Sequence, residues 1–498
     1  MKPTDVSDPR YYHKVVDCQW GCPAHTNVPE YIRLIAQGRF TEAYMLNRES
    51  NVFPGILGRT CDRPCEPACR RTRLDGEPVA ICRLKRVAAD LRGDIEELLP
   101  RAPDVKNGRL VEHGYHVFPQ WYPNVRAILD RIGVQLIDFD RYHFLLPGEY
   151  PRKITVRGPS SLAAIWHNTI HGLLPWYHNI LFFYSVLDMM SRPLSATKFL
   201  DRVSQIGLIR GKWYTSESVA ELAQENVLKA SAIPAYDLSA MTAKRISSYW
   251  VRGASPFLSV LPGDLQTVFI EPQVRELAAL GVEIRYDCEV SGVVMSDGRV
   301  GAITLRDGTA LSADVYALCT PFEVTRTWLQ DSLYTADPEL GNLHFLEAQP
   351  MAALHLRLRH PLPDLPREHV FFHGSHYALS FIDESRLWPG LDDKPQLSFI
   401  SSNYGPLHGV SAEAAKELLV QEISEYLPIT SADVESWELN TNTDVPLFIN
   451  TIGAWPNRPR PKSRVKNLYL AGDFVKNAID LACMEGAVSA ALEVAGQI

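Results

Sequence analysis

The sequence predicts an α/β protein with a small helical domain at its N-terminus and a larger mixed domain after it. Most of the nine cysteines lie within the first 90 residues, where the apolar pattern is helical. Short strand patterns and Asp-Gly turns appear only in the later part of the chain. A length of 498 residues suits two or three domains. We therefore expect a helical domain over 1–106 and an α/β domain over 109–498.

Composition and charge narrow the class of protein. The chain is 46% hydrophobic and 22% charged, as in an ordinary globular protein. A net charge of −8 gives no indication of a nucleic-acid partner, and none is expected. The first residues contain no apolar core of a signal peptide, which predicts a cytoplasmic location.

The first 106 residues carry two helical patterns. Residues 29–50 are amphipathic, and residues 83–99 have a basic first half and an acidic second half. Pro100, Pro103 and the polar residues 104–108 then form a predicted linker to the second domain.

The cysteines of this domain are the most specific pattern in the sequence. Cys61, Cys65 and Cys69 are spaced by three residues each, and two further cysteines precede them and one follows: Cys18, Cys22 and Cys82. An iron–sulfur cluster needs several thiolate ligands, and closely spaced cysteines supply them from one loop. A structural zinc site, with four ligands in spaced pairs, is the main alternative. Unligated structural cysteines are the third interpretation.

The sequence around the cysteines resembles a known domain. Residues 15–92, with CPAHTNVPEYIRL, GRTCDRPCEPACRR and PVAICRLKRVAADL, resemble the N-terminal cluster domain of glutamate synthase small subunits and dihydropyrimidine dehydrogenases. The resemblance implies one [4Fe–4S] cluster on four ligands: Cys22, Cys61, Cys65 and Cys82. Cys18 and Cys69 would belong to a second cluster, for which two family ligands are missing because residues 8–17 contain no cysteine. The resemblance therefore implies one cluster and leaves a second open.

Beyond residue 109 the expected elements are strands, helices and a cap. Strand patterns and the final helix are predicted at 282–286, 290–295, 301–305, 315–318, 468–471 and from about Glu485. Residues 159–260 are mostly helical and rich in aromatics, which predicts a cap over a cleft. Residues 173–190 are too interrupted by polar residues for a spanning helix, so they are either a buried helix or a patch that contacts lipid or a hydrophobic substrate.

Three stretches of this second part resemble the flavin-dependent amine oxidase and phytoene desaturase superfamily: EHGYHVF, GVEIRYDCEVSGVV and LYLAGDF…CMEGAVSAA. The resemblance implies an FAD-binding, Rossmann-like fold, with Glu112 beside the flavin ring and the backbone of Val290 at the adenine. The last stretch implies further cofactor-binding residues: Gly472, Asp473, Met484, Glu485, Gly486 and Ala487.

The chemistry of the last stretch can be stated directly. A short strand delivers Gly472 and Asp473 to its C-terminal end, where α/β folds place ligands. Asp473 can accept hydrogen bonds from ribityl hydroxyls, and the helix from Glu485 can direct its N–H groups at the cofactor. The structural alternative is an ordinary helix cap.

The first element of such a flavin site is missing. A site of this class opens with a strand, a Gly-x-Gly-x-x-Gly turn and a helix, yet no Gly-x-Gly occurs in the 498 residues. The gap falls near residues 106–110, as though a βαβ block had been removed. Loss of that block should leave neighbouring strands with unpaired backbone groups. The predicted Rossmann-like fold is therefore incomplete, and FAD binding is predicted only from the resemblance.

These features predict a flavin-dependent oxidoreductase in which a [4Fe–4S] cluster relays electrons. The substrate would be a small and hydrophobic molecule, oxidised or reduced under the cap, with a protein as redox partner and peripheral contact with a membrane. Four aromatic side chains are candidates to line the flavin face: His113, His116, Trp121 and Tyr122. The alternatives are an iron–sulfur electron-transfer or partner-binding protein with a non-functional flavin domain, and a flavoenzyme sequence that carries a deletion.

Overall fold

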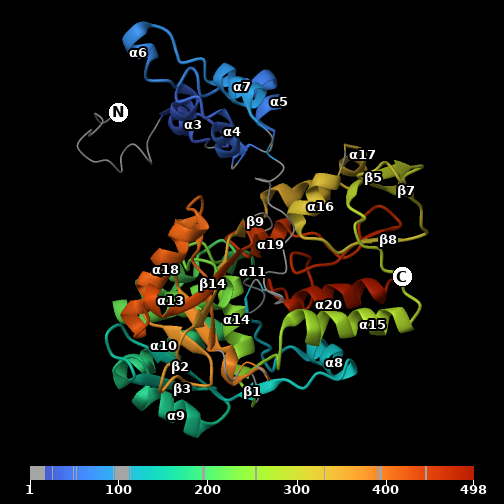
Figure 1. Ribbon diagram of the computed structural model, residues 1–498. Coiled ribbons are helices and arrows are strands. Elements are labelled where there is room, and N and C mark those ends of the chain that lie inside the picture. The colour runs from blue at the N-terminus through green and yellow to red at the C-terminus, as the bar shows by residue number, and fades with distance from the viewer. Residues whose placement is uncertain are drawn as a thin grey trace. The chain divides into compact units, whose positions relative to one another are not determined.

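The computed structural model describes residues 17–498 apart from 25, 49, 52, 94, 96–111, 113, 193–196, 253–254, 330, 390, 392–394 and 444–445. The chain divides into two compact units, Met1–Lys106 and Asn107–Ile498 (Figure 1). Each unit is described by itself.

The first unit is helical. Its described helices are α2 (Asp17–Trp20), α3 (Val28–Ala36), α4 (Phe40–Arg48), α5 (Pro54–Thr60), α6 (Thr72–Asp75) and α7 (Ile81–Leu91). The pattern predicted over 29–50 forms two helices instead of one, because Gly38 adopts a φ of 74° and turns the chain between α3 and α4. The pattern predicted over 83–99 begins inside α7, and its last residues lie mostly outside the described ranges.

The second unit contains a seven-stranded sheet in the order β14-β10-β13-β12-β11-β2-β3. Its strands are β2 (Arg141–Leu145), β3 (Lys153–Arg157), β10 (Ala352–Leu358), β11 (Val370–Phe372), β12 (Leu379–Asp383), β13 (Gln396–Ser401) and β14 (Val434–Thr441). Helix α18 (Ala412–Tyr426) buries Leu419 and Ile423 against this sheet and completes its core. All neighbours in the sheet are antiparallel except β11 and β2.

The segment predicted as a cap is mostly helical. It contains α9 (Leu162–His171), α10 (Trp176–Ser191), α11 (Thr197–Leu200), α12 (Gln205–Ile209), α13 (Glu217–Ser231) and α14 (Ala240–Arg252). Its own core is formed by residues such as Leu200, Ala235 and Leu238, which are fully buried. No helix in the described ranges is long and apolar enough to cross a bilayer.

The remaining strands form small sheets. The parallel pair is β8 (Tyr316–Leu318) and β16 (Leu468–Leu470). The antiparallel groups are β5 (Val290–Ser296), β6 (Arg299–Leu305) and β7 (Ala310–Leu311); β1 (Ile137–Phe139) and β4 (Leu258–Val260); β9 (Glu347–Gln349) and β15 (Leu447–Ile449). The other helices are α8 (Pro123–Arg131), α15 (Glu271–Ala279), α16 (Phe322–Trp328), α17 (Asp331–Ala336), α19 (Ala454–Asn457) and α20 (Met484–Ala495).

The mixed α/β fold class is confirmed, but one predicted strand is wrong. Residues 282–286 follow α15 and lead to β5 without joining a sheet among the described residues. The predicted strands at 290–295, 301–305, 315–318 and 468–471 are present within a residue or two. Segment 282–286 has a strand-like alternation but no described neighbour with which to pair, and a strand exists only when its backbone groups find partners.

Candidate functional site

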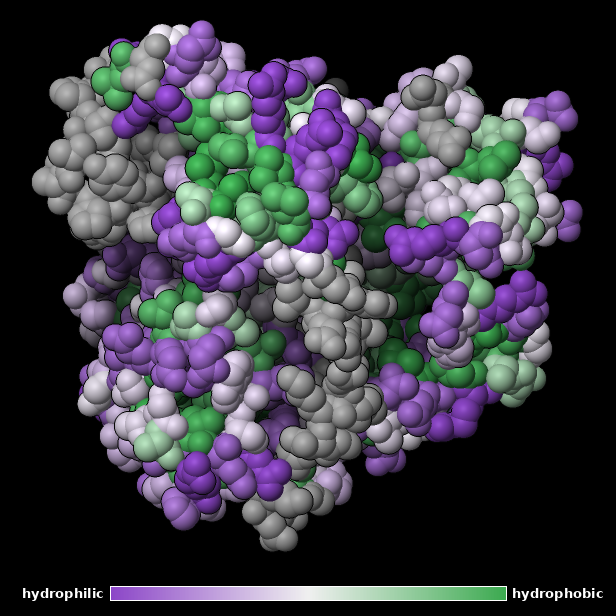
Figure 2. Space-filling view, turned by 45° about the horizontal axis from the view of Figure 1, so that its top comes forward, coloured by the Kyte–Doolittle hydropathy of each residue, from purple (hydrophilic) through white to green (hydrophobic). Residues whose placement is uncertain are grey.

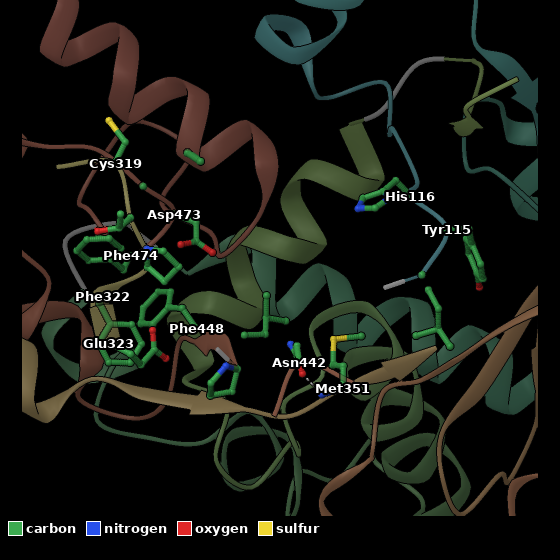
Figure 3. A pocket seen from close by; sticks show the side chains of 18 residues that line it. Tyr115, His116, Cys319, Phe322, Glu323, Met351, Asn442, Phe448, Asp473 and Phe474 are labelled. Carbon is green, nitrogen blue, oxygen red and sulfur yellow. Dashed lines mark hydrogen bonds between the residues drawn. The ribbon is translucent and has the colours of Figure 1, made fainter. Parts of the chain in front are cut away.

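A cavity of about 700 Å³ opens in the second unit at the C-terminal ends of β8 and β16. Phe322, Phe448 and Phe474 lie at one end, and Tyr115 and His116 lie at the other (Figure 3). The remaining lining residues are Gly114, Cys319, Thr320, Pro321, Glu323, Met351, Ile400, Asn442, Pro446, Leu447, Gly472, Asp473 and Ala487. The cavity is therefore mainly apolar, with a few polar groups.

Gly472 and Asp473 follow β16 directly and line this cavity. Gly472 has a φ of 155°, and a Cβ there would lie 2.8 Å from Cε1 of Phe474, so no side chain fits. Asp473 turns its carboxylate toward the cavity (Figure 3). Burial raises the pKa of Asp473 to about 6, against the opposing effect of the Arg458 guanidinium.

Arg458 holds the loop that follows the Gly-Asp pair. Its side chain is fully buried and donates to the backbone carbonyls of Asp473, Phe474 and Val475 at 2.8–3.0 Å. It also forms an ion pair with Asp480 at 2.5 Å. Since one guanidinium satisfies three consecutive carbonyls, the position of Asp473 depends on a residue that sequence reasoning did not identify.

Helix α20 begins beside the same cavity. Cys483 caps it, with its Sγ accepting from the N–H of Gly486 at 3.4 Å. A Cβ on Gly486 would lie 2.3 Å from the carbonyl oxygen of Leu481, so the helix can start here only with glycine. Ala487 lines the cavity, whereas Gly486 and Met484 do not.

Glu485 has a different environment from the one predicted. Its carboxylate is fully buried and accepts from the backbone N–H groups of Asn124 and Val125 at 3.1 and 3.0 Å and from the Asn124 side chain at 2.7 Å. These groups lie in the first turn of α8, so Glu485 ties α20 to the N-terminus of α8. It does not line the cavity.

Glu323 is the polar group of the cavity that sequence reasoning missed. It lies in the first turn of α16, after β8, and both of its buried carboxylate oxygens lack a hydrogen-bond partner. Burial raises its pKa, and the neighbouring charge of Asp473 acts in the same direction. No pattern marks Glu323 in the sequence, because its proximity to Asp473 depends on the parallel pairing of β8 with β16.

Glu112 is buried near the far end of the cavity but does not line it. Its carboxylate accepts from the backbone N–H of Leu265, and its backbone carbonyl accepts from His355 at 2.8 Å and Asn440 at 2.7 Å. Glu112 therefore joins β10, β14 and the segment before α15. His116, by contrast, lies at the cavity wall.

The other predicted flavin contacts lie elsewhere. Val290 begins β5 and pairs with Leu305, outside the cavity. Met484, Trp121 and Tyr122 pack in the core between α8 and α20. His113 lies outside the described residues.

The six cysteines of the first unit lie close to one another. Cys18, Cys65 and Cys82 are buried, and Cys22, Cys61 and Cys69 are partly buried. They come from α2 and the turn after it, from the end of α5, from the loop before α6 and from α7. Among the described residues no three His, Cys, Asp or Glu side chains converge closely enough to hold a single metal ion. In a cubane each thiolate binds a different iron atom, so its ligands stand further apart than those of one ion.

The thiols lie close enough to affect one another's pKa values. Burial raises the pKa of Cys82 to about 12, and Cys61 and Cys65 add to this effect. Burial also raises the pKa of Cys65, with Cys22 and Cys61 as its thiol neighbours. These four are the residues that the family resemblance implies for one cluster.

Cys18 lies near thiols of both proposed ligand sets. Its pKa rises to about 11 through burial, and Cys69 and, to a smaller extent, Cys65 act in the same direction. Lys85 on α7, which is buried, acts in the opposite direction on Cys22, Cys65 and Cys82, whose thiolate forms it favours. A buried cation therefore accompanies these three thiols.

The cavity fits part of an FAD molecule. The orphaned oxygens of Glu323 and the carboxylate of Asp473 offer acceptors for hydroxyl groups, and the aromatic and aliphatic walls suit a flavin ring. No lysine or arginine is among the described residues that line it, so of these residues a pyrophosphate would find only backbone groups as cationic or N–H partners. These acceptors and apolar walls thus suit the ribityl and ring portions of the cofactor.

Comparison with known proteins identifies both parts of the chain. Residues 11–96 match the family model of the dihydropyrimidine dehydrogenase domain II 4Fe-4S cluster. Residues 235–498, more than half of the chain, match the model of the flavin containing amine oxidoreductases. The chain belongs to the flavin-containing amine oxidoreductase family and carries an iron–sulfur domain in front of the matched region. The two matches confirm the predicted pairing of these domain types and support a [4Fe–4S] cluster and FAD as cofactors.

Individual relatives match different shares of the chain. The β subunit of the NADP(+)-dependent formate dehydrogenase of Moorella thermoacetica is 47% identical over 73 residues, which are 15% of this chain and 10% of that protein. The 15-cis-phytoene desaturase of Arabidopsis thaliana is 22% identical over 463 residues, covering 86% of this chain and 80% of the desaturase. The chain spans a fifth or less of the length of the relatives that match its cysteine-rich domain with the strongest scores.

Solved structures share the fold of the second unit. Putrescine oxidase superposes with a TM-score of 0.60 at 14% identity, covering 79% of this chain and 89% of the oxidase. An oxidoreductase from Methanosarcina mazei gives a TM-score of 0.57 at 14% identity, over 78% and 90% of the two chains. At these identities the similarity extends to the fold alone.

Proposed function

We propose that the protein is an FAD-dependent oxidoreductase in which a [4Fe–4S] cluster relays electrons to or from the flavin. The observation that carries this proposal is the cavity at the end of β16. Asp473 turns its carboxylate toward this mainly apolar space, and Glu323, whose buried carboxylate has no hydrogen-bond partner among the described residues, lines its wall. A bound flavin would supply hydride exchange with an organic substrate and single-electron exchange with a metal centre.

In this proposal each lining group has a task. Asp473 and Glu323 accept hydrogen bonds from the hydroxyls of the cofactor, and Phe322, Phe448 and Phe474 exclude water from one end of the cavity. Ala487 lies close to the N-terminus of α20, and its small side chain lets the backbone of that helix approach the cofactor. Arg458 keeps Asp473 in place through the three carbonyls that it binds.

The cluster would be held by Cys22, Cys61, Cys65 and Cys82, with Lys85 balancing part of its negative charge. Cys18 and Cys69 would be the two thiols left from a second site. This division rests on the family resemblance.

The substrate is proposed to be a hydrophobic small molecule. Met351, Ile400 and Leu447 line the cavity, and the described lining residues include no charged side chain other than the two carboxylates and His116. A surface of this character favours apolar ligands with few hydrogen-bonding groups.

Peripheral membrane contact is a further part of the proposal. Helices α9 and α10 expose a continuous set of large apolar side chains, among them Trp166 (69% exposed) and Trp176 (58%). Trp213 (85%) lies beside Tyr184 of α10, with ring centroids 6.0 Å apart. Exposed tryptophan and tyrosine suit the interface between lipid headgroups and acyl chains. Figure 2 shows apolar patches, in green, bordered by hydrophilic residues, in purple, on the face that it presents.

Co-sedimentation with phosphatidylcholine vesicles tests this contact. The Trp166→Ser/Trp176→Ser variant should bind vesicles at least several-fold more weakly than the wild type. Phe345→Ser, which removes an equally exposed aromatic from another part of the surface, should bind like the wild type. Equal sedimentation of all three proteins would contradict peripheral binding through α9 and α10.

The oxidoreductase proposal is tested by flavin content. The protein is purified under nitrogen, and the flavin released on denaturation is counted per chain. Asp473→Ala and Glu323→Gln should each lower flavin occupancy, since each removes a hydrogen-bond acceptor from the cavity. Asp314→Ala, at an exposed carboxylate between β7 and β8, is the matched control and should leave occupancy unchanged.

A second candidate function is electron transfer or partner binding by the cluster domain, with a flavin domain that does not bind its cofactor. The absence of any Gly-x-Gly in the sequence favours it. It predicts iron but no releasable flavin in every variant, including the wild type.

A further inference from the structure

Residues 282–286 form an unpaired, strand-like segment at the surface of the second unit. The chain turns at Gly281 (φ 79°), and the N–H of Val282 donates to the carbonyl of Leu277 at 3.0 Å. Residues 282–285 then show neither helix nor turn, and a bend at 286–287 with Asp287 at φ 55° ends the segment. No backbone hydrogen bond joins residues 283–286 to any described part of the chain.

Along this segment apolar side chains alternate with charged ones. Val282, Ile284 and Tyr286 are 46%, 37% and 67% exposed, although apolar residues with this alternation normally cover a core. Leu277 and Leu280, just before the segment, are also exposed. An exposed apolar strand with free N–H and C=O groups is a template for another strand.

We infer that this edge pairs with the same edge of a second copy of the chain, as an antiparallel dimer with its two-fold axis at Ile284. In that register Glu283 faces Arg285 of the partner copy, and the reverse pair repeats the contact. Val282 faces Tyr286, a β-branched residue opposite an aromatic, and Ile284 faces itself. The segment is thus complementary to its own reverse in charge and in shape, as a two-fold interface requires.

The hydrogen bonds of the free chain select the edge through which the segment pairs. Among the described residues, the N–H and C=O groups of Glu283 and Arg285 have no backbone partner, so they can form the hydrogen-bonded pairs of the ladder. Val282, Ile284 and Tyr286 then occupy the non-hydrogen-bonded positions. The N–H of Val282 is already engaged with Leu277, which excludes pairing through the opposite edge, whereas the register follows from the charge and shape of the side chains.

One ion pair has to change partners when the dimer forms. Within a single chain Glu283 and Arg285 form an ion pair of 2.7 Å, and both side chains are more than half exposed. Dimerisation replaces the two intrachain pairs, one in each copy, by two pairs across the interface, so no charge is left without a partner. The inference is independent of the cofactors, because none of these residues lines the cavity.

Charge reversal tests the inference in the full-length chain. Sedimentation equilibrium from about 1 to 100 µM, the range of weak interfaces, should give a concentration-dependent mass that approaches twice the 56.0 kDa of one chain. Glu283→Lys and Arg285→Glu should each weaken association at least tenfold, because each places like charges opposite one another. The double variant E283K/R285E should associate like the wild type, and an equimolar mixture of the two single variants should form a heterodimer.

Disulfide trapping tests the register. In a non-hydrogen-bonded pair the Cα atoms are about 4.5 Å apart, within the range of a disulfide. Ile284→Cys should form a covalent dimer when glutathione disulfide oxidises the two thiols, releasing two glutathione molecules. Val294→Cys, an equally exposed position on β5, and the wild type should not. A wild type that stays monomeric at all concentrations, single variants that associate normally, or Ile284→Cys that does not crosslink would each overturn the proposal.

Discussion

Asp473 experiences two opposing effects on its pKa. Burial disfavours its charged form and raises the pKa from 3.8 to about 6, whereas Arg458 favours the carboxylate. The folded protein therefore holds a proton on Asp473 between about pH 4 and 6, where the unfolded chain has released it. The stability that this proton contributes is present below about pH 4 and is lost as the pH rises through about 6.

The Asp473→Asn variant should lose this dependence. Because asparagine does not titrate, the flavin-free variant should gain about 1–3 kcal/mol relative to the flavin-free wild type between pH 4 and pH 7. The difference in unfolding free energy between the two proteins, measured by urea denaturation at each pH, isolates the one carboxyl group. A difference that stays constant across this range would mean that Asp473 titrates near its ordinary pKa.

Arg458 is predicted to be the most sensitive charged residue of the second unit. Arg458→Met removes one of the two arginines that pair with the buried Asp480, the other being Arg245, and it removes the donor of three carbonyls. It should destabilise the protein by about 3–5 kcal/mol. Arg460→Met, an exposed neighbour in the same segment, should change stability by less than about 0.5 kcal/mol. Chemical denaturation of both variants makes the comparison, and similar losses would refute the buried network as the cause.

At the scale of elements, the start of α20 should depend on one glycine. Gly486→Ala would place a Cβ 2.3 Å from the Leu481 carbonyl, so the helix must shift away from the cavity wall. We expect a loss of about 1–3 kcal/mol and a lower flavin content, because Ala487 moves with the helix. Gly496→Ala at the other end of α20 is the control, since its Cβ would meet only an ordinary contact at 3.5 Å. Equal behaviour of the two variants would contradict this role.

Elements were predictable where local pattern and pairing agree. The strands at 290–295 and 301–305 are joined by the Asp297-Gly298 turn, so each strand has its pairing partner next to it in the sequence. Segment 282–286 has the same apolar alternation, but a strand that could pair with it would have to come from a distant part of the sequence. The alternation of apolar residues alone could not show that no strand among the described residues pairs with this segment.

The site was predictable only in part, for the same reason. The Gly472-Asp473 pair and the helix after it could be located from a local motif. Glu323, Arg458 and Lys85 could not, because each acts through neighbours that the fold brings from distant segments. Glu485 belongs to the motif, yet its carboxylate binds α8 about 360 residues earlier in the chain.

In the whole molecule, the chain joins a cysteine-rich helical unit to a flavoprotein fold, and its sequence contains no Gly-x-Gly. The account rests on both units carrying their cofactors in the same polypeptide. Fe–S domains and flavins are suited to each other because a flavin exchanges both one and two electrons. Either cofactor alone would point to a different function.

The most direct test is to count iron and flavin in the same sample of the full-length protein, purified under nitrogen. The account predicts about four irons per chain with the broad visible absorption of a [4Fe–4S] cluster, together with one releasable FAD. Cys61→Ser should lose the iron and keep the flavin, since Cys61 and the flavin cavity belong to different units. Iron without any flavin in the wild type would contradict the central claim.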